Sequence, residues 1–154
     1  MMRIFEIATG KEIEAIIQPL NDRDVTIIKN SKSFNFDWQK LKGKIYKLAK
    51  VGSPDVLGLM SLIEHGVGWD AIEIELLEVG EENVGKNKSV DRIAGCLIAF
   101  ACRESIKTGH GGFVFLKPKT ELERWYQKAY GFEYTGFNMA SFDTNSVELI
   151  KKYL

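Results

Sequence analysis

The stretch from Ala71 to Phe132 most constrains the fold, because it places one long helix between two apolar strands. Its first segment, AIEIELLEV, has the composition of a strand, and FVFL at 113–116 is a short apolar run typical of a buried strand. Between them lies a polar, turn-rich loop and then a segment with apolar residues at helical spacing to about Lys107. A strand, a helix and a second strand of this kind favour a right-handed crossover between parallel strands.

The start of this helix has the features of an anion-binding site. The sequence IAGC at 93–96 places small side chains where the first backbone N–H groups of a helix lack partners. These groups and the positive end of the helix dipole attract phosphate, and Lys86, Lys88 and Arg92 add positive charge nearby. Small residues also occur in buried helices for close packing, so the pattern alone leaves both interpretations open.

The strand at 71–79 carries acidic residues among apolar ones. Strict alternation places two sets of side chains on opposite faces, namely Ile72, Ile74 and Leu76 on one face and Glu73, Glu75 and Leu77 on the other. Two carboxylates therefore share a face. A solvated outer face is the ordinary explanation, and a general base for catalysis is the alternative.

Further strands flank this central unit. Lys44–Lys50 alternates, a Gly-Ser-Pro-Asp turn follows at 52–55, and the next apolar segment at 56–63 completes a clear hairpin. The N-terminal segments at 3–8 and 12–17 predict a second hairpin, although the latter also fits a helical turn. A further strand is expected over Phe132–Phe142, with Gly136 as the point at which it could be interrupted.

Composition bounds the function classes. A chain of 154 residues with 45% hydrophobic residues predicts a single domain over 1–154. Lys plus Arg and Asp plus Glu both number 21, which argues against nucleic acid as a partner. The sequence contains no apolar run of about 20 residues and no signal-peptide pattern, so no membrane association and a cytoplasmic location are expected.

The histidines and cysteines do not suggest a metal site. Each type occurs twice, and neither shows the spacing of metal ligands. Cys96 and Cys102 would lie on one helix and point in different directions, so they are expected to be reduced packing residues.

Taken together, these residues resemble the general N-acetyltransferase (GNAT) superfamily. The matching features lie within residues 44–142: the hairpin, the strand AIEIELLEV, the helix with Gly95 and Leu97 after its start, the strand FVFL, and the helix ending WYQKAYGF. The resemblance implies an α/β (α+β) fold with a mixed, mostly antiparallel central sheet, a splayed parallel strand pair and flanking helices.

The resemblance also implies acetyl-CoA as cosubstrate, held between the splayed strands. The family's phosphate motif has Gln or Arg, then Gly three positions later, then Gly or Ala two positions after that. These positions fall on Val90, Ile93 and Gly95, and only Gly95 fits. Asn87 or Lys88 is expected to compensate for the missing polar side chain. The residues expected to contact the cofactor are Leu77, Val79, Asn87, Lys88, Ile93, Ala94, Gly95, Cys96 and Leu97.

The same resemblance suggests catalytic roles. Tyr126 matches the tyrosine that commonly protonates the departing thiolate, with Tyr130 as a rival. Glu73 matches the general base of those members that have one, and Glu75 is the second candidate. The expected acceptor site is lined by the N-terminal segment, the loop at 64–69, and the aromatic residues Phe34, Phe36 and Trp38.

Three functions are compatible with this sequence. The first is transfer of an acetyl group from acetyl-CoA to a primary amine of a small molecule or protein, in a ternary complex. The second is binding of CoA or another ligand without turnover. The third is a toxin-like acetyltransferase acting on aminoacyl-tRNA, against which the balanced charge argues. A homodimer is expected because it is the commonest assembly.

Overall fold

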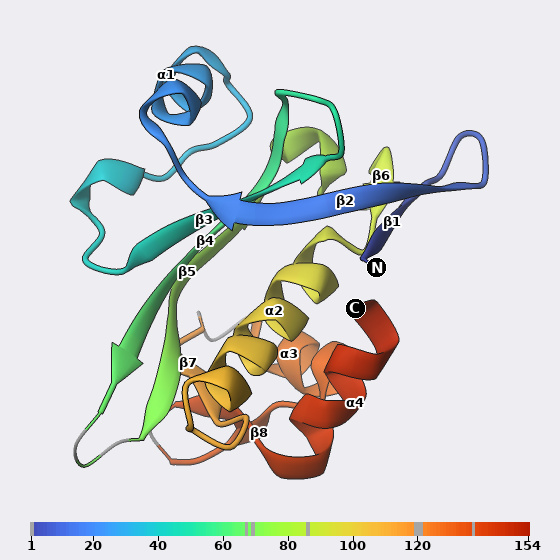
Figure 1. The fold of residues 1–154 in the computed structure, drawn as a ribbon. Helices are drawn as coiled ribbons and strands as arrows, with labels where there is room; N and C mark the ends of the chain where they lie inside the picture. The colour runs from blue at the N-terminus through green and yellow to red at the C-terminus, as the bar shows by residue number, and fades with distance from the viewer. Residues whose placement is uncertain (1, 67, 69, 86, 119–121, 137) are drawn as a thin grey trace.

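A computed structural model describes residues 2–154 except 67, 69, 86, 119–121 and 137 (Figure 1). Within the described residues, nine strands form one sheet in the order β6-β1-β2-β3-β4-β5-β7-β9-β8. The strands are β1 (Arg3–Glu6), β2 (Lys11–Pro19), β3 (Lys44–Lys50), β4 (Val56–His65), β5 (Ala71–Val79), β6 (Val90–Asp91), β7 (Val114–Leu116), β8 (Glu133–Tyr134) and β9 (Met139–Ser141). The helices are α1 (Asp22–Asn30), α2 (Ile93–Lys107), α3 (Glu123–Tyr130) and α4 (Asp143–Tyr153), with short 3-10 turns η1 (Trp38–Lys40) and η2 (Glu81–Asn83).

The sheet is mostly antiparallel, and β5 and β7 form the one parallel pair in the described ranges. This arrangement confirms the expected mixed fold and the crossover through α2. β7 pairs with β5 only at residues 72–74. The edge of β5 at 75–79 therefore has no strand beside it on that side in the part of the chain described.

Helix α2 lies at the centre of the molecule. It packs against β4 and β5 on one side and against α4 on the other (Figure 1). Its apolar residues join the strand residues Ile72 and Ile74 in the largest core cluster. A smaller cluster on the opposite sheet face forms around Trp38 and Leu59. No helix in the described ranges is both long and apolar enough to cross a bilayer.

The pairing of β4 with β5 contains a one-residue irregularity at Glu75. Leu62 lies opposite Ile74, but the preceding residue Ser61 lies opposite Leu76. Glu75 is therefore the extra residue of a β-bulge, and the alternation of side chains changes phase there.

The bulge overturns part of the predicted facing of β5. Leu77 and Val79 pack against the core that contains Ile72 and α2, whereas Leu76 packs in the Trp38 cluster on the other face. The prediction that Leu76 shares a face with Ile72, and Leu77 with Glu73, is wrong. The consequence is functional, because Leu77 and Val79 now face the same side as the start of α2.

The terminal parts of the sheet follow the sequence less uniformly. The N-terminal segments form the β1–β2 hairpin rather than a helical turn. The strand expected at 132–142, with Gly136 as its point of interruption, is a hairpin in which Tyr134 of β8 pairs with Met139 of β9. Gly136 lies between them with a φ of 90°, a left-handed conformation that ends the first strand and permits the reversal.

Candidate cofactor and active site

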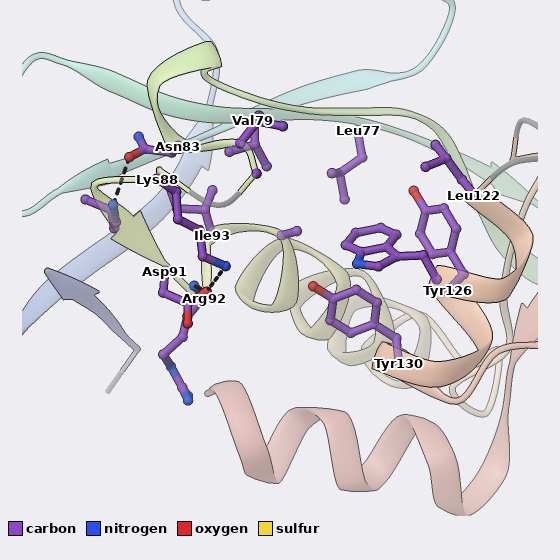
Figure 2. A pocket seen from close by; sticks show the side chains of 15 residues that line it. Leu77, Val79, Asn83, Lys88, Asp91, Arg92, Ile93, Leu122, Tyr126 and Tyr130 are labelled. Atoms are coloured by element: carbon purple, nitrogen blue, oxygen red, sulfur yellow. Dashed lines mark hydrogen bonds and ion pairs between the residues drawn. The ribbon is translucent and has the colours of Figure 1, made fainter. Parts of the chain in front are cut away.

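A cavity of about 540 Å³ lies where β5 extends beyond β7 (Figure 2). One wall is formed by Leu77 and Val79 of β5, and residues 83–85 and 88 close one end. The first turn of α2 and the aromatic residues of α3 form the remaining walls. The cavity is large enough for part of an extended ligand and has both apolar and polar walls.

The loop before α2 is held in place by Asn83. Its side-chain oxygen accepts the backbone N–H of Val90 at 2.9 Å, and β6 pairs with β1. Val90, at the family's polar motif position, is consequently buried in the core and supplies its apolar side chain there. The sequence indicates Asn83 only as one residue of the lengthened polar loop and gives it no role of its own, because nothing there distinguishes it from its neighbours.

Asp91 is a second residue that the sequence analysis missed. Its Oδ1 accepts the N–H of Arg92 at 2.8 Å and lies 2.7 Å from Nζ of Lys88. The hydrogen bond from Lys88 is the largest of the effects that hold the pKa of Asp91 below its usual range, and it outweighs burial. Lys88, expected to contact the cofactor, lines the cavity, and its charge is paired with Asp91 (Figure 2).

Arg92 does not direct its charge into the cavity. Its Nη2 donates to the carbonyl of Lys152 at 2.7 Å, and its guanidinium lies 4.9 Å from the ring centre of Tyr153. Figure 2 shows the side chain of Arg92 leading away from Tyr126 and Tyr130. Lys86, also expected at this rim, lies outside the described residues.

Only part of the predicted phosphate-binding segment at 93–97 lines the cavity. Ile93 and Ala94 line the cavity. Gly95 instead packs against α4, because a Cβ there would collide with the ring of Tyr153. The N–H of Cys96 donates to the carbonyl of Arg92, and burial raises the pKa of its thiol to about 11, as expected for a packing residue. Leu97 is fully buried, and Asn87 is exposed outside the cavity lining.

The opposite wall carries Tyr126 and Tyr130. Both are buried, with exposed fractions of 8% and 9%, and both line the cavity. Trp125 lies between them in edge contacts, with ring centres 4.8 Å from Tyr126 and 5.1 Å from Tyr130. Burial raises the pKa of both phenols, so both hydroxyls stay protonated at neutral pH.

Gly131 ends α3 and so fixes where the two tyrosines point. It has a φ of 70°, and its backbone lies against the side-chain amide of Asn145. That amide donates to the carbonyl of Tyr130 at 2.9 Å. Only glycine fits this left-handed position without striking Asn145.

The two candidate bases lie outside this cavity. Glu73 falls between core-facing Ile72 and Ile74, so its side chain is on the other sheet face, 2.7 Å from Nε2 of His65. Glu75 accepts hydrogen bonds from the backbone of residues 42 and 43 and from the hydroxyl of Ser61. Burial alone would raise the pKa of Glu75, but these hydrogen bonds outweigh it and lower the pKa.

Glu78 is a structural anchor that the sequence analysis overlooked. Its two carboxylate oxygens accept the indole N–H of Trp38 and the backbone N–H of Asn35, both at 2.7 Å. It thereby ties the loop after α1 to β5. The adjacent apolar pair Leu76-Leu77 is the sequence signal that interrupts alternation and permits Glu78 to face this loop.

A second cavity, of about 530 Å³, lies between α1 and the loop held by Glu78. Phe34, Phe36 and Trp38, the aromatic residues expected at the acceptor site, line it. It shares its sheet face with the Trp38 cluster, opposite the face that carries α2.

Comparison with solved structures defines the fold. The spermidine/spermine N-acetyltransferase SpeG from Vibrio cholerae, solved in mutant forms, aligns with a TM-score of 0.63 at 15% identity, covering 88% of this chain and 98% of that chain. AtaTR bound with AcCoA aligns with a TM-score of 0.61 at 17% identity, covering 90% of this chain and 98% of that chain. YhhK from E. coli, solved with coenzyme A, aligns at 0.54 and 13% identity, covering 86% and 100%.

The fold is therefore that of the GNAT superfamily of N-acetyltransferases. No protein-family model and no curated protein sequence matches the chain.

Proposed function

We propose that this protein is an acetyl-CoA-dependent N-acetyltransferase that acetylates a primary amine of a small molecule or protein. The observation that carries the proposal is the cavity between the open edge of β5 and the buried hydroxyl of Tyr126. Two structures of the same fold were solved with AcCoA or coenzyme A, which supports this cavity as the cofactor site.

The residues at the cavity fit this cosubstrate. Leu77 and Val79 provide an apolar wall, and the edge of β5 at 75–79 offers backbone groups to which the amide-containing pantetheine arm can pair as an added strand. The N–H groups of Ile93 and Ala94 lie at the start of α2, where a pyrophosphate is stabilised by the helix dipole.

The proposed chemistry is a direct transfer. A neutral amine attacks the thioester carbonyl, so that a C–N bond forms, the C–S bond breaks and the sulfur leaves as a thiolate. Tyr126 is the proposed acid for that thiolate, and the protonated hydroxyl of this buried residue suits the role. The surplus proton of the new amide nitrogen then restores Tyr126, so that the amide, the free thiol of CoA and a neutral tyrosine remain. Holding both reactants in place supplies several kcal/mol of the lowered barrier.

Glu73 is the proposed base that takes the proton from the ammonium form of the amine, directly or through water. Nε2 of His65 lies 2.7 Å from this carboxylate and, in the tautomer that carries its proton on Nε2, donates to it and holds it in place. Glu75 is the weaker candidate, because its carboxylate already accepts hydrogen bonds from three groups and its pKa is lowered. An acceptor bound at the cavity of Phe34 and Trp38 would approach from the same sheet face as these carboxylates.

Binding and turnover test this proposal in sequence. Thermal unfolding with CoA and with acetyl-CoA should show stabilisation that increases with ligand concentration. Consumption of acetyl-CoA is then measured against a panel of polyamines, amino acids and lysine peptides. Absence of stabilisation at millimolar ligand would remove acetyl-CoA from the proposal.

A CoA-binding protein without turnover is the second candidate. Two observations favour it: Gly95 packs against Tyr153 rather than opening the cavity, and Asp91 places a carboxylate at the helix start. Stabilisation by CoA with no acetyl-CoA consumption across the panel would select this function over transfer.

A further inference from the structure

The ion pair between Lys88 and Asp91 lies beside the first turn of α2, on the wall of the cavity (Figure 2). The two side chains are 36% and 48% exposed, so they can separate without unfolding the loop. Asp91 also accepts the N–H of Arg92. The protein thus places its own negative charge where the start of a helix attracts an anion.

An independent observation shows that the cavity is suited to a polar ligand. Tyr126 and Tyr130 are each more than nine-tenths buried, and Figure 2 shows both hydroxyls on the cavity side. Neither hydroxyl has a hydrogen-bond partner among the described residues. Both hydroxyls open into the cavity, where a ligand that carries acceptor atoms would accept their hydrogen bonds.

Asp91 and Tyr130 both line this cavity, and their charges and dipoles influence the same bound ligand. Besides burial and the nearby Tyr153 and Tyr126, the charge of Asp91 contributes to the raised pKa of Tyr130. The cavity therefore has a protonated hydroxyl on one side and a paired carboxylate on the other. An incoming anion would gain the hydroxyl and Lys88 as donors but would be repelled by Asp91.

We infer that the ion pair between Lys88 and Asp91 is exchanged when the cofactor binds: the pyrophosphate of CoA displaces Asp91 from Lys88 at the start of α2. We call this exchangeable ion pair the latch. Asp91 then lowers the affinity for the cofactor. Lys88 contributes fully to pyrophosphate binding only after its ion pair with Asp91 has separated. This inference rests on the proposed cofactor, but the pyrophosphate group alone is sufficient to test the latch.

The test is calorimetric titration of wild-type protein and Asp91→Asn with CoA, inorganic pyrophosphate and pantetheine. Asparagine keeps an acceptor for the N–H of Arg92 and removes the charge. We expect roughly fivefold tighter binding of CoA and pyrophosphate, unchanged binding of pantetheine, and a smaller difference at high salt. Asp55→Asn in the exposed turn between β3 and β4 removes the same charge and should change none of these affinities.

A double-mutant cycle tests the exchange itself. Lys88→Gln should weaken pyrophosphate binding more in the Asp91→Asn background than in the wild type, because Lys88 is already released there. Equal losses in both backgrounds would overturn the latch, as would unchanged or weaker pyrophosphate binding by Asp91→Asn, or no binding by either protein. Tighter pyrophosphate binding by the variant, with CoA bound by neither protein, would support the latch and reject the proposed cofactor.

Discussion

Tyr126 offers the most direct test of catalysis at the level of one residue. Tyr126→Phe removes only the buried hydroxyl, so acetyl-CoA turnover should fall by about 100-fold or more, the ordinary contribution of a positioned proton donor. CoA affinity should remain within a few-fold. Tyr134→Phe removes a hydroxyl from a residue that is 64% exposed and should leave turnover unchanged. Unchanged turnover in Tyr126→Phe would transfer the acid role to Tyr130 or to water.

The three glutamates of β5 differ in what their carboxylates contact. Glu73 contacts a histidine, Glu75 binds backbone N–H groups, and Glu78 anchors Trp38. Their partners lie between 8 and 43 positions away in the sequence. A strand pattern cannot distinguish a base from an anchor, because the distinction depends on loops that the pattern does not place.

His110 makes the stability of one sheet end depend on pH. Its ring nitrogens lie 2.5 Å from Asp70 and 2.9 Å from Glu64, and these hydrogen bonds raise its pKa despite burial. The stabilising effect is therefore complete below the unfolded pKa of about 6.5 and is lost as the pH rises through the folded value. The two carboxylates are 76% and 56% exposed, so salt will weaken the effect.

His110→Gln should accordingly lower the unfolding temperature more at about pH 5.5 than at about pH 8.5. Thermal unfolding of both proteins across this range, at low and high salt, provides the measurement. If the difference in unfolding temperature between the two proteins stays constant with pH, the ring of His110 stabilises the fold by packing alone.

At the level of elements, the sequence predicts β3, β4, β5, α2 and β7 well, because alternation and helical spacing are local properties. It does not predict the bulge at Glu75, because an extra residue in one strand is defined only against its partner β4. The hairpin of β8 and β9 was missed for a similar reason. Gly136 permits either an interruption or a reversal, and the pairing with β7 selects the reversal.

The candidate cavity was predicted in part. Leu77, Val79, Lys88 and Tyr126 all line it, as do the first residues of α2. What could not be predicted is the partner of each residue across the fold. Gly95 fits both a phosphate cradle and a helix contact, and the position of Tyr153 decides between them.

Gly95→Ala tests that helix contact. Alanine is the better helix former by about 1 kcal/mol, so a purely local effect would stabilise α2. The structure predicts the opposite, a loss of about 1–3 kcal/mol in unfolding free energy, because the new methyl group strikes Tyr153. Chemical denaturation measures it, with Gly66→Ala as a control in open space. Unchanged or increased stability would show that Tyr153 and α4 move aside without loss of unfolding free energy.

At the level of the whole molecule, the two ends of the chain meet beside the start of α2 (Figure 1). Arg92 joins them, because its guanidinium donates to the carbonyls of Arg3 in β1 and Lys152 in α4. The ring of Tyr153 lies against the same guanidinium. One side chain thus connects the first strand, the helix at the cavity and the last helix.

Arg92 also adopts a φ of 79°, which costs a side-chain-bearing residue about 1–2 kcal/mol. Arg92→Ala should lose the guanidinium contacts and retain this strain, whereas Arg92→Gly loses the same contacts and relieves it. We therefore expect both variants to be less stable than wild type in urea unfolding, with alanine the worse by about 1 kcal/mol. Wild-type stability in both would mean that the contacts to β1 and α4 contribute nothing. Equal losses of unfolding free energy in the two variants would mean that the left-handed conformation of Arg92 is not strained. The CoA affinity of the same proteins would show whether the contacts between the chain ends hold the cavity in shape.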